Sequence, residues 1–171
     1  MMNSLIPVLL VMIGPTAYAL KPEAGNHLGN PSAVVRKYCD ADLKGARLSS
    51  DGHTKYGLDG LVSWDQEPGW DSSKIVSGYR IVSVDQQGDS ATVKVEWDVL
   101  GAGSCTVVPG AKKETLNYRL SRAKGQWKID GPMTPPHASP KALAEYFKGM
   151  SGSDCASNFL SGLADLQRAA H

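Results

Sequence analysis

The sequence lacks the features by which several classes of protein are recognised. It has no block of lysine or arginine, and its formal net charge is only +1, so it offers no electrostatic footprint for nucleic acid or an anionic membrane. No His-x-x-x-His or Cys-x-x-Cys spacing is present to place two metal ligands on one helix or turn. We therefore expect no nucleic-acid partner, no metal site and no cofactor.

Charge is also absent from the side chains of the first nineteen residues. This segment contains the apolar run 5–13 and ends in the small residues of Ala17-Tyr18-Ala19. The pattern predicts a secretory signal peptide over 1–19 that is cleaved before Leu20. An uncleaved anchor is the less favoured alternative, because a spanning helix needs about 20 apolar residues. The mature chain is then secreted or periplasmic and has no membrane attachment.

The 152 residues that follow the signal peptide (171 minus 19) have the length of one domain. Residues 20–30 show no periodicity and are predicted to form a flexible lead. The segment 31–150 is predicted to be a single domain, and 151–171 a helical extension at the carboxyl terminus.

A strict alternation of apolar and polar residues marks the middle of the chain. This period of two is typical of strands with one buried and one wet face. It predicts an antiparallel sheet of about four strands, at roughly 74–85, 90–100, 112–122 and 126–130. A long flexible loop with Gly101-Ala102-Gly103 is expected over 101–111. The side chains expected to face the helices are Val93, Val95, Trp97, Leu116, Tyr118, Trp127 and Ile129.

Helices are predicted on both sides of the strand block. Asn30 followed by Pro31 is a favourable helix start, and apolar spacing continues this helix to about Leu48. One or two short helices are expected between 49 and 73. After the prolines that follow Gly131, Ser139-Pro140 begins another helix, and Ser153 or Asp154 begins the last. The fold class is α+β, a curved sheet covered by helices.

Three cysteines remain after signal cleavage, so at most one disulfide can form within the chain. Cys39 lies on the apolar stripe of the first helix, Cys105 in the glycine-rich loop and Cys155 at the start of the last helix. We predict that Cys105 pairs with Cys155. The alternative is that all three cysteines are reduced and Cys39 is a small core residue.

Four segments stand out beside this order of elements. They are Leu61-Val62-Ser63-Trp64, Glu67-Pro68-Gly69-Trp70-Asp71, Val76-Ser77-Gly78-Tyr79-Arg80 and Trp127-Lys128-Ile129-Asp130-Gly131-Pro132. With the order of elements, they resemble the nuclear transport factor 2-like superfamily of small cone-shaped α+β domains, and within it secreted bacterial members of unknown function, over roughly residues 31–150. The superfamily includes isomerases, dehydratases, epoxide hydrolases and non-catalytic binding modules, so the resemblance does not choose a function.

Catalytic candidates are few. The resemblance implies one or two acidic or histidine side chains inside an apolar cone, where burial raises the pKa of a carboxyl group. Asp65, Asp71 and His137 are the catalytic candidates, provided that they turn inward. Asp40 and Asp42 are two residues apart on the first helix, and we interpret them as a solvated face.

Aromatic side chains give a second set of site candidates. Large rings with one polar atom suit contact with a ligand, but the same rings also fill ordinary cores. Both interpretations stay open, and the tryptophans beside the Pro68-Gly69 turn are least explained by a core. The ligand-binding candidates are Tyr38, Trp64, Trp70, Tyr79 and Tyr118.

From these patterns we expect a secreted or periplasmic, non-catalytic binding or accessory domain for a small apolar or mixed ligand, or for a protein. One alternative is a small-molecule isomerase, dehydratase or hydrolase that uses acid-base residues inside the cone. Another is a protein-protein interaction module, with a homodimer as one form. A cone filled by its own side chains would argue against both the enzyme and the small-ligand module.

Overall fold

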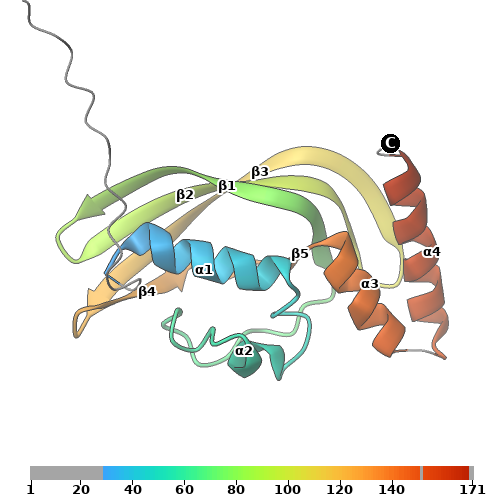
Figure 1. Ribbon diagram of the computed structural model, residues 1–171, viewed down its shortest axis with the longest axis horizontal. Helices are drawn as coiled ribbons and strands as arrows, with labels where there is room; N and C mark the ends of the chain where they lie inside the picture. Colours follow the sequence, from blue (N-terminus) through green and yellow to red (C-terminus); the bar gives the residue numbers. More distant parts are fainter. Residues whose placement is uncertain (1–28, 151, 170–171) are drawn as a thin grey trace, which may run out of the picture.

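The computed structural model describes residues 29–150 and 152–169, which form an arched sheet with helices on its concave side and at one end (Figure 1). The predicted α+β class with a curved sheet is confirmed. The predicted signal peptide and most of the predicted lead lie outside the described residues. The elements are α1 (Pro31–Leu43), α2 (Gly52–Lys55), β1 (Ser73–Gln87), β2 (Ser90–Gly103), β3 (Val107–Ala123), β4 (Gln126–Gly131), β5 (His137–Ala138), α3 (Pro140–Gly149) and α4 (Asp154–Ala169).

The sheet has five strands rather than about four, in the order β4-β3-β2-β1-β5. The first four form the predicted antiparallel series, but β5 pairs parallel to β1 through Lys74 with His137 and Ile75 with Ala138. The sequence did not reveal β5 because two residues between prolines carry no alternation. Pro136 adds a backbone contact here, since its carbonyl accepts a hydrogen bond from the Lys74 amide at 2.7 Å.

The prediction of a long flexible loop over 101–111 is wrong, because β2 and β3 continue through most of that segment. Gly101 pairs with Pro109, and only residues 104–106 connect the strands. A Cβ atom on Gly101 would lie 2.6 Å from the Val108 carbonyl oxygen, and one on Gly103 would lie 2.3 Å from that of Thr106. These glycines therefore allow close approach of two strands, and the register shift between Val99 and Gly101 bends the sheet there.

The first helix begins as predicted but ends earlier. The Asn30 side chain accepts a hydrogen bond from the Ser32 amide at 2.9 Å, and Pro31 occupies the first turn. The helix stops at Leu43 rather than Leu48, because Gly45 adopts a φ of 87°. The amide of Ala46 then bonds to the Ala41 carbonyl, which closes a Schellman motif and turns the chain away from the helix axis.

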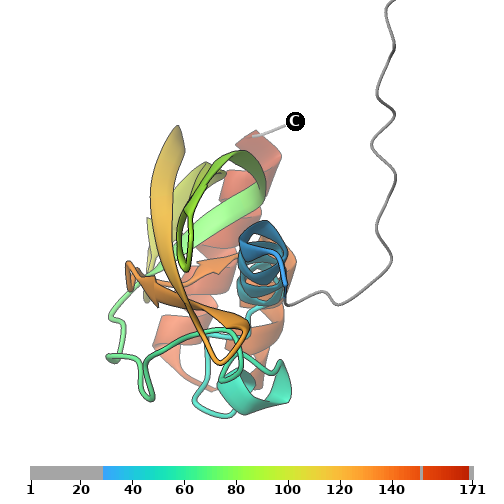
Figure 2. The ribbon, with the colours of Figure 1, turned by 90° about the vertical axis from the view of Figure 1, so that its left-hand side faces the viewer.

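Two apolar clusters hold these elements together. The larger lies between α1, residues 58–62 and the concave face of the sheet (Figure 2). The predicted inward set is confirmed for six fully buried side chains, while Leu116 is half-buried at the edge of the cluster. The smaller cluster joins α3, α4 and the start of β1, where the rings of Phe147 and Phe159 stack at 3.9 Å. The last helix is therefore part of a core.

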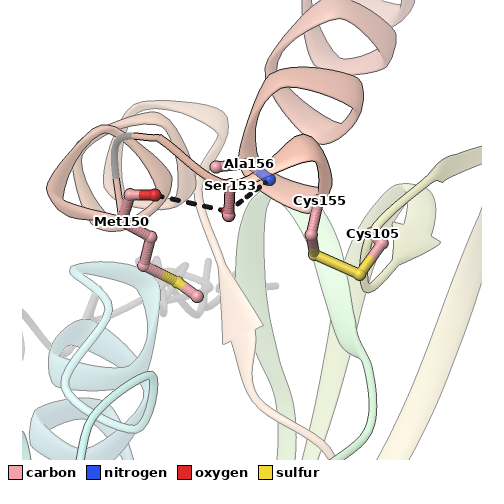
Figure 3. The surroundings of a disulfide bond; sticks show 5 residues. All are labelled: Cys105, Met150, Ser153, Cys155 and Ala156. Atoms are coloured by element: carbon pink, nitrogen blue, oxygen red, sulfur yellow. Dashed lines mark hydrogen bonds between the residues drawn. A yellow bond between two sulfur atoms is a disulfide. The ribbon is translucent and has the colours of Figure 1, made fainter.

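The predicted disulfide between Cys105 and Cys155 is present, and Cys39 is a buried free thiol. The bond joins the turn after β2 to the first turn of α4 (Figure 3). Beside it, the Ser153 hydroxyl accepts a hydrogen bond from the Ala156 amide and donates one to the Met150 carbonyl. The disulfide and this cap fix the start of α4 against the sheet and the end of α3.

Replacing both disulfide cysteines, as Cys105→Ala with Cys155→Ala, is expected to lower the free energy of unfolding by about 2 to 4 kcal/mol. The closed loop has a sequence separation of 50, and opening it increases the entropy of the unfolded chain. Chemical denaturation followed by circular dichroism measures the change. As a control, a thiol reductant should destabilise the Cys39→Ala variant and leave the double variant unchanged; equal sensitivity of both would contradict the assignment.

Candidate functional site

A cleft of about 710 Å³ lies between the segment that connects α1 to β1 and the end of the molecule that carries the disulfide. Residues 47–54 and 65–73 contribute one part of its lining. The turn after β2, the last turn of α3 and Cys155 contribute the other. The volume falls in the range of small-molecule sites, about 300 to 1,000 Å³.

Arg47 lines this cleft, yet its side chain is completely buried by neighbouring groups. Its guanidinium lies 3.1 Å from an Asp42 carboxylate oxygen and 2.8 Å from one of Glu67, and it also donates to the Thr134 carbonyl. Burial by itself would lower the pKa of Arg47, but the two carboxylates outweigh it and raise the pKa. Through these three partners, Arg47 holds together the end of α1, the segment 65–73 of the cleft lining and the segment before β5.

Glu67 connects this ion pair to the aromatic lining of the cleft. Both of its carboxylate oxygens accept hydrogen bonds from Arg47 Nε, and one accepts from Trp70 Nε1 at 3.3 Å. Burial opposes ionisation of Glu67, but the bonds from Arg47 lower its pKa. His53 lies between two carboxylates, 2.7 Å from Asp59 through Nδ1 and 3.4 Å from Glu67 through Nε2. Trp70 is therefore held in place by a connected polar network.

Asp42 is completely buried, so the interpretation of Asp40 and Asp42 as a solvated face holds for Asp40 alone. One Asp42 oxygen accepts hydrogen bonds from Arg47 and, at 3.0 Å, from the His137 amide. Burial raises the pKa of Asp42 to about 6, against the opposing charge of Arg47 and that amide bond. The spacing of Asp42 from Val35 and Tyr38 matches the buried stripe of α1, which is the sequence signal that identifies it.

His137 is buried behind the cleft, not in it. Its ring stacks on Trp97 with the centroids 4.7 Å apart. Nδ1 is 3.8 Å from Asp42 and Nε2 is 3.5 Å from Glu114. Burial lowers the pKa of His137 to about 4, although the Glu114 carboxylate opposes this shift. The imidazole is therefore neutral at pH 7.

The concave interior of the sheet is filled by the protein's own side chains. Tyr38, Trp97, Tyr118 and Trp127 have no exposed surface, and the rings of Tyr38 and Tyr118 meet edge to face at 5.7 Å. The hydroxyl groups of both tyrosines are buried without a hydrogen-bond partner. This packing argues against both an enzyme site and a small-ligand site inside the cone, so a ligand site has to lie outside it.

The predicted site residues are spread over three places. Trp70, Asp65 and Asp71 line the cleft. Tyr38, Tyr118 and His137 are in the interior, and Trp64 is half-buried with its ring edge to face against Tyr38 at 6.4 Å. Tyr79 ties β1 to α1, because its hydroxyl donates to Asp40 at 2.6 Å.

The sequence did not single out Arg47, Glu67 or His53 as site residues. They come from the irregular segment between α1 and β1, where no period of two or 3.6 indicates which side chains turn inward. Arg47 follows Gly45, and its direction depends on the turn that this glycine makes. Only the tertiary structure brings Arg47, Glu67 and Thr134 together.

No group of three or more metal-ligating side chains occurs among the described residues. None of the described helices is long and apolar enough to cross a bilayer. Comparison with known proteins finds no protein family, no curated protein and no solved structure that matches this chain.

The Arg47→Met substitution is expected to lower the free energy of unfolding by about 3 to 5 kcal/mol, because it leaves the Asp42 carboxylate buried without its charged partner. Urea denaturation at pH 7 measures this loss. The matched control is Arg80→Met, since Arg80 forms an exposed pair with Glu96, and exposed pairs contribute little to stability. If the two variants lost similar free energies of unfolding, the buried ion pairs of Arg47 would be no more important for stability than an exposed pair.

Asp42 and His137 should give opposite dependences of stability on pH. Asp42 binds a proton more tightly in the folded state, with its pKa raised from 3.8 to about 6, so its contribution falls as pH rises over that window. His137 binds a proton less tightly, with its pKa lowered from 6.5 to about 4, so its contribution rises with pH. In the intact protein these two slopes oppose each other.

Single substitutions should reveal each slope. Between pH 4 and 6, Asp42→Asn is expected to become more stable as pH rises, and His137→Gln less stable, by up to about 1.4 kcal/mol per pH unit. Urea midpoints at a series of pH values provide the measurement. Parallel profiles for the two variants would show that these groups do not titrate in this way.

Proposed function

We propose that this chain is an exported, non-catalytic binding or accessory domain whose ligand site is the cleft beside Trp70. The apolar amino-terminal pattern supports export, as does the disulfide, because disulfides persist in oxidising compartments. The resemblance to the nuclear transport factor 2-like superfamily remains part of this proposal. The arched sheet with α1 on its concave side supports it (Figure 1).

The observation that carries the proposal is the fixed position of Trp70 in a cleft of about 710 Å³. Its indole nitrogen donates to Glu67, and the Arg47 guanidinium lies 6.0 Å from its ring centroid. An aromatic ring held in this way loses little conformational entropy when a ligand packs on it. The cleft thus has a preformed apolar surface with polar groups beside it.

A binding role accounts for the polar groups better than acid-base catalysis does. Both nitrogens of His53 face carboxylates, so neither points freely to a substrate. Asp65 and Asp71 are exposed at the cleft, whereas His137 is buried away from it. The three catalytic candidates therefore do not converge on one substrate position, which general acid-base chemistry requires.

Association through the outer sheet face is the weaker candidate for a protein partner or a homodimer. Charges on that face are already paired with one another, because Glu96 contacts both Arg80 and Lys113, and Lys113 also contacts Asp98. A stable interface usually has an apolar centre that is depleted in charge.

Tryptophan fluorescence and thermal unfolding of the mature chain with a metabolite and peptide panel test the proposal. Ligands that fill the cleft should raise the melting temperature and change the emission of Trp70. The other three tryptophans lie outside the cleft lining, Trp97 and Trp127 fully buried and Trp64 half-buried, and should give a constant background. The Trp70→Ala variant should lose both responses and remain folded. Met133→Ala is the control, since Met133 is 42% exposed but lies outside the cleft. Stabilisation that persists in Trp70→Ala would rule out this site.

A further inference from the structure

We propose that the cleft binds an organic cation, an ammonium or guanidinium group on an apolar skeleton. This inference rests on the proposed function and adds the chemical class of the ligand. Two sources carry this chemistry, a free amine and a lysine or arginine side chain of a peptide. Three features of the cleft support this class of ligand. They are the Trp70 ring, which is held by its hydrogen bond to Glu67, the apolar residues at the end of α3, and a lining with more carboxylate groups than cationic groups.

The cations that line the cleft are already neutralised by the protein. Arg47 has no exposed side-chain surface and is paired with Asp42 and Glu67, so it is shielded from an incoming anion. His53 is enclosed by Asp59 and Glu67. No lysine among the described residues lines the cleft. An anionic ligand therefore finds no free positive partner in the part of the chain that the structure describes.

Two carboxylates of the cleft have no partner among residues 29–150 and 152–169. Asp65 and Asp71 are exposed, they flank Trp70 in the sequence, and no ion pair among the described residues involves either of them. They leave the rim of the cleft with uncompensated negative charge. A cation that enters beside Trp70 gains attraction from this rim. Since the Arg47 guanidinium already lies 6.0 Å from the centroid of the indole ring, the cation would contact the ring surface that Arg47 leaves uncovered.

The last turn of α3 supplies the surface for the apolar part of the ligand. Tyr146, Phe147 and Met150 line the same cleft as Trp70, and Met150 is 42% exposed. Methionine is flexible and polarisable, so it adapts to ligands of different shape. The Ser153 hydroxyl bonds to the Met150 carbonyl and fixes the backbone at this point (Figure 3). One cleft thus offers an apolar wall and a negative rim.

The test compares three probes that share one skeleton and differ in charge: phenylpropylammonium, neutral phenylpropanol and phenylpropanoate. Fluorescence titration of the mature protein should give the tightest binding for the ammonium, weaker binding for the alcohol and the weakest for the carboxylate. The preference for the ammonium should shrink as sodium chloride rises from about 0.05 M to about 0.5 M, because exposed charges are screened. Acetyl-Phe-Lys-amide against acetyl-Phe-Gln-amide tests the peptide source.

The Asp65→Asn with Asp71→Asn variant should bind the ammonium about fivefold more weakly, as expected for two exposed ion pairs, and bind the alcohol unchanged. The control is Asp85→Asn with Asp130→Asn, which removes the same net charge from exposed positions outside the cleft. This control should retain the full preference for the ammonium. Circular dichroism of both double variants confirms that they are folded.

Each outcome separates this inference from the proposed function. If the alcohol or the carboxylate binds the intact protein as tightly as the ammonium, the inference fails and the binding role of the cleft stands. If the preference for the ammonium survives in Asp65→Asn with Asp71→Asn, the assignment of these carboxylates is wrong. If no probe binds, the inference fails, while the metabolite and peptide panel with Trp70→Ala still decides the proposed function of the cleft.

Discussion

The buried guanidinium of Arg47 is the interaction on which the rest of this structure depends. It lies where the end of α1, the segment before β1 and the segment before β5 meet, and it bonds to one group from each. Of these three, only the end of α1 is regular, and the segments before β1 and before β5 have little regular structure of their own to set their positions. Because removing a charge from water is costly, the guanidinium stabilises the fold only while all three partners surround it.

This arrangement also explains why the cleft is organised while its neighbourhood is irregular. Residues 56–72 contain no helix or strand longer than a single bridge, yet Glu67 and Trp70 have defined partners. Around Glu67 and Trp70 the order comes from side-chain contacts to Arg47 and His53, while Leu61 and Ser63 also form backbone hydrogen bonds with Ile129. Loops positioned in this way by a rigid scaffold are common sites of recognition.

The sequence predicts the regular elements well, because their signals are local. The alternation around Trp97 fixes which face of β2 is buried, and Asn30 with Pro31 marks the start of α1. The sequence points to three of the residues that line the cleft, Trp70 as a ring least explained by a core and Asp65 and Asp71 as catalytic candidates. The role of Arg47 is not predicted, because it depends on partners far away in the chain. Gly101 led to a wrong prediction, because glycine is typical of loops. Here its lack of a side chain instead allows β2 and β3 to approach each other closely.

The position of β5 has a consequence for the order in which the molecule assembles. The chain leaves the sheet at one edge, in β4, and returns at the opposite edge beside β1 after only residues 132–136. The contacts that complete the interior are therefore very distant in sequence: the Asp42 carboxylate and the His137 amide are 95 residues apart, and Arg47 and Thr134 are 87 apart. High contact order slows folding, because long loops must close before such contacts stabilise the chain. Until His137 is in place, the most costly buried charges of the molecule have no complete set of partners.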